Sequence, residues 1–135
     1  MNGTSRRPAR HTPGARTLGE ITADLARRIP ERLLEHKTRG GQRLTYIPWY
    51  RAQKILDHYA PGWSGSVVSI TTTRERVFVV YRVTIPTAEG AVSREATGTE
   101  LLDCSSYGDP TSNAESMAFR RACARFGLGL YLYDQ

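Results

Sequence analysis

Apolar residues in the first part of the chain recur at helical spacing, and proline and glycine divide this part into elements. A capping box of Thr17 and Glu20, followed by apolar residues three and four positions apart, predicts a helix over residues 17–29. Pro30 then begins a second short helix, PERLLEHK (30–37), because proline is tolerated in the first helical turn. The glycine pair in TRGGQ ends this helix, and RLTYI is expected to form a short strand.

The next helix begins at Pro48 and has one apolar side and one basic side. Its apolar stripe consists of Trp49, Ala52, Ile55, Leu56 and Tyr59. On this pattern we interpret Trp49 as a core residue. The opposite side carries Arg51, Lys54 and His58, at spacing i, i+3, i+7.

From Ser64 onward the hydrophobic period changes to two, which predicts three strands. Their sequences are SGSVVSITTT (64–73), RVFVVYRVTI (76–85) and AVSREATGTEL (91–101). Alternate residues of the second strand share one face, namely Val77, Val79, Tyr81, Val83 and Ile85. Tight turns join the strands, the second of them spanning 86–90. Three consecutive antiparallel strands form a meander.

The segment LDCSSYGDPTS (102–112) is expected to be a loop, and Ser112 or Asn113 to cap the last long helix. One side of this helix carries residues suited to packing on the sheet, namely Phe119, Ala122, Cys123 and Phe126. The opposite side carries Ala114, Ala118, Arg121 and Arg125, with Arg120 on the flank. Small alanines on this charged side would let a phosphate chain approach closely.

The element order is helix, short strand, helix, three strands, helix, which predicts a single α+β domain over residues 17–135. Residues 1–16 contain four arginines and no acidic residue, and we interpret them as a disordered basic arm. An organelle transit peptide is the alternative for this arm, because such peptides are also rich in arginine and poor in acid.

The formal net charge is +6 and the sequence pI about 9.7. Lys37 and Lys54 are the only lysines, so arginine supplies most of the positive charge. A basic surface favours a polyanion partner such as nucleic acid, although it also serves solubility. Arginine suits the first role through its forked donors and its stacking plane.

Several other classes of site lack a pattern in the sequence. Cys104 and Cys123 form no paired metal motif, and we expect two free thiols in a reducing compartment, with a disulfide in a secreted protein as the alternative. The histidines do not cluster at ligand spacing, no apolar run is long enough to cross a membrane, and no glycine-rich loop with lysine suggests nucleotide binding. The nearest carboxylates, Asp103, Asp109 and Glu115, have no recognised nuclease spacing and are interpreted as turn and capping residues. We therefore expect neither a metal nor another cofactor.

Aromatic residues lie close to the basic side of the helix that begins at Pro48. Tyr46, Trp49 and Tyr50 are adjacent to Arg51 and Lys54. Arginine interleaved with aromatic rings suits a single nucleic-acid strand, because its unpaired bases can stack. The alternative for the arginines of both helices is an ordinary solvated helix face.

Two stretches in their order and spacing resemble the Rad fifty-two family of single-strand annealing proteins. They are GGQRLTYIPWYRAQKILDHYAPGWSGSV, followed by the three-strand meander, and AESMAFRRACARFGLGLYLYD. The resemblance covers residues from about Leu25 to Asp134 and is nearest to the small bacterial and phage members, including the DdrA type. It implies a β-β-β-α unit in which the meander packs on the C-terminal helix, preceded by the N-terminal helices and the short extra strand.

The same resemblance implies an assembly of many identical subunits, in a ring or a helical filament. It implies that single-stranded DNA lies in a basic groove and is annealed to a complementary strand without nucleotide hydrolysis, so the protein is expected not to be an enzyme. Its place would be recombination and double-strand break repair in the cytoplasm of a bacterial or phage-infected cell. Its expected partners are single-stranded DNA and further copies of itself, without a membrane. A single-strand binding protein or nuclease of the same pathway is a further candidate partner.

By position, the resemblance assigns DNA binding to Arg51 and to the pair Arg120 and Arg121. The family often has an arginine where this chain has Ala124, and the neighbouring Arg125 lies on another face of the helix. The full set of candidate DNA-binding residues is Arg43, Tyr50, Arg51, Lys54, Arg120, Arg121 and Arg125. A protein that binds and protects single-stranded DNA or RNA ends without annealing them is the alternative function.

Overall fold

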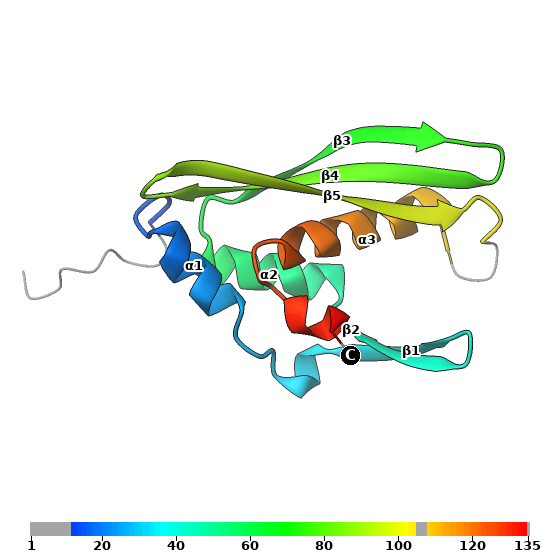
Figure 1. The fold of residues 1–135 in the computed structure, drawn as a ribbon, viewed down its shortest axis with the longest axis horizontal. Coiled ribbons are helices and arrows are strands. Elements are labelled where there is room, and N and C mark those ends of the chain that lie inside the picture. Colours follow the sequence, from blue (N-terminus) through cyan, green and yellow to red (C-terminus); the bar gives the residue numbers. More distant parts are fainter. Residues whose placement is uncertain (1–11, 105–107, 135) are drawn as a thin grey trace, which may run out of the picture.

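The structure, a computed structural model, describes residues 12–104 and 108–134, and in this part of the chain it is a mixed α+β fold with two antiparallel sheets. The α-helices are α1 (Leu18–Leu25), α2 (Trp49–Tyr59) and α3 (Pro110–Ala124), and two 3-10 turns are η1 (Glu31–Leu33) and η2 (Leu130–Tyr133). The strands are β1 (Glu35–Arg39), β2 (Gln42–Tyr46), β3 (Ser64–Thr72), β4 (Arg76–Thr87) and β5 (Gly90–Leu101). Figure 1 shows the sheet β3–β4–β5 above the helices and the hairpin β1–β2 below them.

The predicted meander is confirmed, with β4 paired to β3 on one side and to β5 on the other. The predicted inward face of β4 is also confirmed, because Val77, Val79, Val83 and Ile85 are at most 1% exposed. A β-bulge interrupts the register of β3 between Val67 and Ser69. The strands β4 and β5 extend almost to each other, so the turn between them is tighter than the predicted 86–90.

Helix α3 is buried on two sides, which corrects the prediction that its alanine side faces a ligand. Ala114 and Ala118 are fully buried and pack with Val77 and Val79 on β4. Phe119, Cys123 and Phe126 are also buried, in the larger cluster that includes α1 and α2. The small alanines therefore admit the sheet's own backbone instead of a phosphate chain. Because α3 lies between the sheet and the other helices, only its flanks are available for charged residues (Figure 1).

The predicted helix over residues 30–37 is wrong. The chain makes only the short 3-10 turn η1 there and then enters strand β1, which pairs with β2 from Glu35–Tyr46 to Arg39–Gln42. The turn is formed by Gly40 and Gly41 with φ of 58° and 79°, which is the two-residue hairpin geometry that glycine favours. The glycine pair therefore joins two strands, whereas the sequence pattern had been interpreted as a helix end.

Two helix boundaries also differ from the prediction. The first helix ends at Leu25, before the predicted Ile29. The last helix is capped by Asp109, whose carboxylate accepts a hydrogen bond from the Ser112 amide at 2.8 Å, and it begins with Pro110 at the first helical position. The predicted caps Ser112 and Asn113 lie inside the first turn, because an aspartate before proline is the stronger start signal here.

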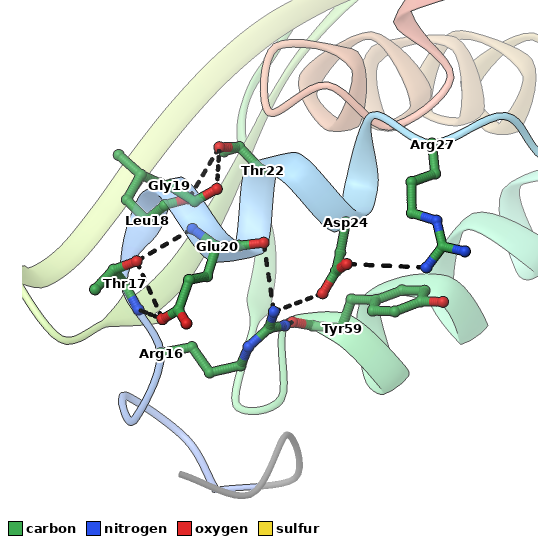
Figure 2. A network of polar contacts seen from close by, with 9 residues as sticks. All are labelled: Arg16, Thr17, Leu18, Gly19, Glu20, Thr22, Asp24, Arg27 and Tyr59. Carbon is green, nitrogen blue, oxygen red and sulfur yellow. Dashed lines mark hydrogen bonds and ion pairs between the residues drawn. The ribbon is translucent and has the colours of Figure 1, made fainter. Parts of the chain in front are cut away.

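The start of the folded domain lies before Thr17, as Figure 2 shows. The Arg16 guanidinium, with its side chain only 11% exposed, forms an ion pair with Asp24 at 2.5 Å and donates to the Tyr59 carbonyl at 3.1 Å. Arg16 therefore ties the chain before α1 to the end of α2 and does not belong to a free arm. Residues 1–11 of the predicted arm lie outside the described residues. The predicted capping box is confirmed, since the Glu20 amide donates to the Thr17 hydroxyl at 3.1 Å.

Candidate nucleic-acid interface

A groove with a volume of about 620 Å³ lies between the β1–β2 hairpin, α3 and the C-terminal turn η2. Its charged lining consists of Lys37, Arg39, Arg43, Arg120 and Arg121. None of the described residues that line it is acidic, whereas Tyr46 and Tyr133 supply aromatic surface. A concave surface with five cations and two phenol rings is suited to a polyanion that also has planar groups.

The alternation of the β1–β2 hairpin explains how it contributes to the groove. Lys37 and Arg39 are two residues apart on β1, so their side chains leave the same face of the hairpin. Their cross-strand partners on β2, Leu44 and Gln42, line the same groove. Near the hairpin turn, Arg39 lies 3.7 Å from the buried carboxylate of Glu100 on β5, and this ion pair connects the hairpin to the main sheet.

Tyr46 is the point at which the hairpin and α3 meet. Its ring centroid lies 4.9 Å from the Lys37 ammonium nitrogen and 5.2 Å from the guanidinium carbon of Arg120. Each distance is within the range of a cation–π contact. The hairpin and α3 thus each place a cation against the same ring.

Two cations of the groove, Arg120 and Lys37, have a lowered pKa. Burial lowers the pKa of Arg120. Burial also lowers the pKa of Lys37, and the positive charges of Arg120 and Arg39 lower it further. Burial penalises the protonated form of both side chains, and like charges penalise that of Lys37 as well, so a bound anion would stabilise both cations.

A carboxylate links this groove to helix α2. The Tyr46 hydroxyl donates to Glu35 Oε1 at 3.1 Å, and the Tyr50 hydroxyl donates to Glu35 Oε2 at 3.4 Å. The Arg51 guanidinium carbon lies 5.7 Å from the Tyr50 ring centroid. Glu35 therefore joins two tyrosines, each of which contacts an arginine that the sequence singled out.

Arg51 has a second notable feature. Its Nε atom is buried and has no hydrogen-bond partner within the described part of the protein. A buried donor without an acceptor costs free energy, and a bound water or ion is one way in which native proteins satisfy such a group.

The candidate residues divide into three groups in the structure. Arg43, Arg120 and Arg121 line the groove. Tyr50 and Arg51 adjoin it through Glu35. Lys54 is exposed one turn further along α2 and is not part of the groove lining.

Arg125 occupies a separate position at the end of α3. It is exposed and, together with Arg94 and Arg121, lines a second cavity of about 610 Å³. Arg121 and Tyr133 line both cavities, so the two are neighbouring parts of one surface, in which Glu95 lies beside the three arginines of the second cavity. Arg94 also donates to the Arg125 carbonyl at 2.6 Å, which holds the end of α3 against β5.

Trp49 is not a core residue, which corrects the sequence interpretation. It is 46% exposed, and its ring lies 5.9 Å from that of Tyr50 in an edge-on arrangement. Ala52 and Leu56, one and two turns later, are fully buried. The first turn of α2 therefore extends past the core that its later turns help to form.

Sequence reasoning missed Glu35, Lys37 and Arg39 as site residues, because they were assigned to a helix or its end. The signal that could have identified them is the glycine pair, which is a two-residue hairpin turn when strands flank it. A hairpin would have placed Lys37 and Arg39 on one face with Tyr46 nearby.

Metal sites and membrane-spanning helices are both absent from the described residues. No group of three or more histidine, cysteine, aspartate or glutamate side chains there is arranged to hold a metal ion. None of the helices in that part of the chain has the length and apolar character needed to span a membrane.

The chain is similar to two plant proteins. It is 43% identical over 123 residues to the DNA repair RAD52-like protein 1, mitochondrial, of Arabidopsis thaliana, and the match covers 90% of this chain and 70% of that protein. It is 44% identical over 124 residues to the DNA repair RAD52-like protein 2, chloroplastic, of the same plant, where the match covers 89% of this chain and 62% of that protein. No family model matches the chain.

Proposed function

This chain belongs to the family of RAD52-like DNA repair proteins, and on that premise we propose that it binds single-stranded DNA in the hairpin groove and anneals complementary strands. The role in DNA repair and recombination is part of this proposal, as is annealing without a nucleotide cofactor. The protein acts as a binding and pairing factor and not as an enzyme.

The observation that carries the proposal is the composition of the groove. Five cations and two tyrosines line it, and none of its described lining residues is acidic. Lysine and arginine bind phosphate without regard to base, whereas tyrosine rings stack on any unpaired base. A single strand supplies both groups at once. A duplex buries its base faces in the stack, so it can use only the cations.

Annealing requires that bound bases stay available for pairing. Contacts directed mainly at phosphates hold a strand without occupying the hydrogen-bonding edges of its bases. The second candidate function, protection of DNA or RNA ends without annealing, uses the same contacts, and the exposed Trp49 next to Tyr50 would favour it if these rings trapped bases.

The decisive experiment mixes two complementary labelled oligonucleotides with the purified protein and follows duplex formation without nucleotide or metal. We expect acceleration over spontaneous pairing, and weaker binding of a preformed duplex than of either strand. The variant Arg120→Ala should reduce both binding and annealing, whereas Arg74→Ala, in the β3–β4 turn, removes the same charge outside the groove and serves as the control. Tight strand binding with no acceleration would favour the protecting function, and no binding would refute both.

We also propose that the protein assembles into a ring or filament of identical subunits. Strand β3 is an edge strand whose nine residues are all exposed, and its apolar side chains Val67, Val68 and Ile70 are between 39% and 53% exposed. Such an edge invites pairing with another chain unless it is covered, although its bulge partly disfavours this. Sedimentation velocity at micromolar concentration should show an oligomer, and a stable monomer would contradict this part of the proposal.

The bacterial or phage subtype and the cytoplasmic location stay predictions. The names of both relatives place those proteins in organelles. An experiment is therefore needed to distinguish a DNA-binding arm from a targeting segment in residues 1–11 of this chain. Fusion of these residues to a fluorescent protein in plant cells should leave it outside organelles if they form a DNA-binding arm.

A further inference from the structure

We propose that Glu35 is a positioning residue that holds Arg51 and Arg120 in register for one strand of DNA, through the hydroxyl groups of Tyr50 and Tyr46. The inference rests on the proposed function and adds to it a residue whose charge has the wrong sign for binding DNA. Glu35 begins strand β1, at the end of the hairpin remote from the glycine turn.

The contacts form one continuous series from α2 to α3. Arg51 lies against the Tyr50 ring, both tyrosine hydroxyls donate to the two oxygens of the Glu35 carboxylate, and Arg120 lies against the Tyr46 ring. The two arginines are 69 positions apart in the sequence and belong to different helices, α2 and α3. Through its hydrogen bonds to the two tyrosines, Glu35 couples the position of Arg51 to that of Arg120.

Both carboxylate oxygens are needed for this arrangement. Oε1 accepts from Tyr46 at 3.1 Å and Oε2 accepts from Tyr50 at 3.4 Å, so each oxygen fixes one ring. A hydroxyl held by the carboxylate fixes where the far end of the ring lies. Lys37 and Arg120 at the Tyr46 ring, and Arg51 at the Tyr50 ring, depend on that ring position.

Simple electrostatics and the positioning role predict opposite effects. An acidic side chain beside a phosphate-binding groove repels DNA, so its removal should strengthen binding. If Glu35 positions the rings, its removal should weaken binding. The cationic side chains would then be mobile in the free protein and would lose conformational entropy when DNA binds. The sign of the change therefore distinguishes the two roles.

The variants Glu35→Ala and Glu35→Gln separate charge from geometry. Both remove the same negative charge, but glutamine keeps two polar atoms that can accept from one tyrosine hydroxyl and donate to the other. We expect Glu35→Gln to bind a single-stranded oligonucleotide at least as tightly as the wild type. We expect Glu35→Ala to bind it weaker than Glu35→Gln by on the order of threefold to tenfold, the worth of one oriented hydrogen bond.

Two controls accompany the pair. Glu31→Ala removes an acid four positions earlier, where the carboxylate contacts His36 and no residue of the tyrosine series, and it should leave binding unchanged or slightly tighter. Unfolding by urea should show that both Glu35 variants remain folded at the temperature of the binding assay. If Glu35→Ala does not remain folded, Tyr46→Phe combined with Tyr50→Phe removes the same two hydrogen bonds while it keeps both rings, and it takes the place of Glu35→Ala with the same expectation.

A titration without DNA tests the network itself. Burial raises the pKa of Tyr46, and the hydrogen bond to Glu35 and its negative charge raise it further. Glu35→Ala should therefore let the Tyr46 phenol ionise at lower pH than in the wild type, as read from the phenolate absorbance that disappears in Tyr46→Phe. No change in this ionisation would overturn the inference.

The outcomes are distinguishable from failure of the proposed function. If the wild type binds single strands but the alanine and glutamine variants bind equally well, the positioning role is wrong and the proposed function stands. If the wild type binds no single strand, the proposed function is wrong and the positioning role falls with it.

Discussion

Gly98 of β5 lies so close to Ala118 of α3 that a Cβ atom at Gly98 would stand 2.5 Å from the Ala118 amide nitrogen and collide with the Ala114 carbonyl. The sheet and the helix thus touch backbone to backbone. This contact sets the height of α3 below the sheet and therefore the position of Arg120 and Arg121 on its flank. We expect Gly98→Ala to destabilise the protein by about 3 kcal/mol or more, at or above the upper range for overpacking, because backbone atoms cannot yield.

Urea unfolding measures this effect, and Gly19→Ala is its matched control. Gly19 lies in α1, and the nearest atom to a Cβ there is 3.9 Å away. Alanine is a better helix former than glycine, so Gly19→Ala in the first turn of α1 should not destabilise the protein. Equal effects of the two substitutions would show that Gly98 is not a contact point.

Arg120→Ala and Arg121→Ala should each weaken binding of single-stranded DNA for all base sequences alike. Each should also lower the slope of log affinity against log salt by about one phosphate contact. Arg121 is exposed, so its loss should cost little stability. Fluorescence anisotropy over a series of salt concentrations measures the slope. An unchanged slope with both arginines and Arg51 replaced would show that the groove does not hold the phosphates.

Arg125→Ala should have a smaller effect on the same measurement. Arg125 lines the second cavity and not the groove, and the second cavity adjoins the groove through Arg121 and Tyr133. The side chain would therefore meet a strand only where it leaves the groove. A change in oligomer size, with binding per subunit unchanged, would instead assign Arg125 to a contact between subunits.

Phe126→Ala should cost about 3–5 kcal/mol of folding free energy, because the ring is 1% exposed in the main core. The Arg94 guanidinium carbon lies 4.8 Å from the ring centroid, so the ring also supports the contact between β5 and the end of α3. Urea unfolding gives the free energy, and the binding assay below the unfolding midpoint is expected to be normal. A stability loss under about 1 kcal/mol would contradict the burial of this ring.

Deletion of residues 1–11 and deletion of residues 1–16 should differ sharply in their effect on stability. The first removes three arginines, Arg6, Arg7 and Arg10, and should lower DNA affinity more at low salt than at high salt. The second also removes Arg16 and leaves the largely buried Asp24 without its 2.5 Å partner, which should cost about 3 kcal/mol. Differential scanning calorimetry of the two truncated proteins compares them. Equal melting temperatures would show that Arg16 does not anchor the domain.

Local sequence patterns were sufficient to predict the elements whose hydrophobic period is long and unambiguous. Alternate valines of β4, the apolar positions Ala52 and Leu56 of α2 and the capping box of α1 can be recognised locally, because each depends on neighbours within one element. The basic character of α3 and the family resemblance could be recognised in the same way. These features were sufficient to predict an α+β fold and a polyanion partner.

Features that depend on residues far apart in the chain became apparent only in the folded molecule. The segment PERLLEHK is predicted helical from its local pattern, but from Glu35 onward the chain forms the strand EHKTR, because its partner QRLTY lies across a glycine turn and satisfies its backbone hydrogen bonds. Ala114 and Ala118 could serve either a ligand or a sheet, and only Gly98 shows which backbone approaches them. Glu35 contributes no positive charge and no motif, so it becomes visible only when folding brings its carboxylate to two tyrosines of other elements.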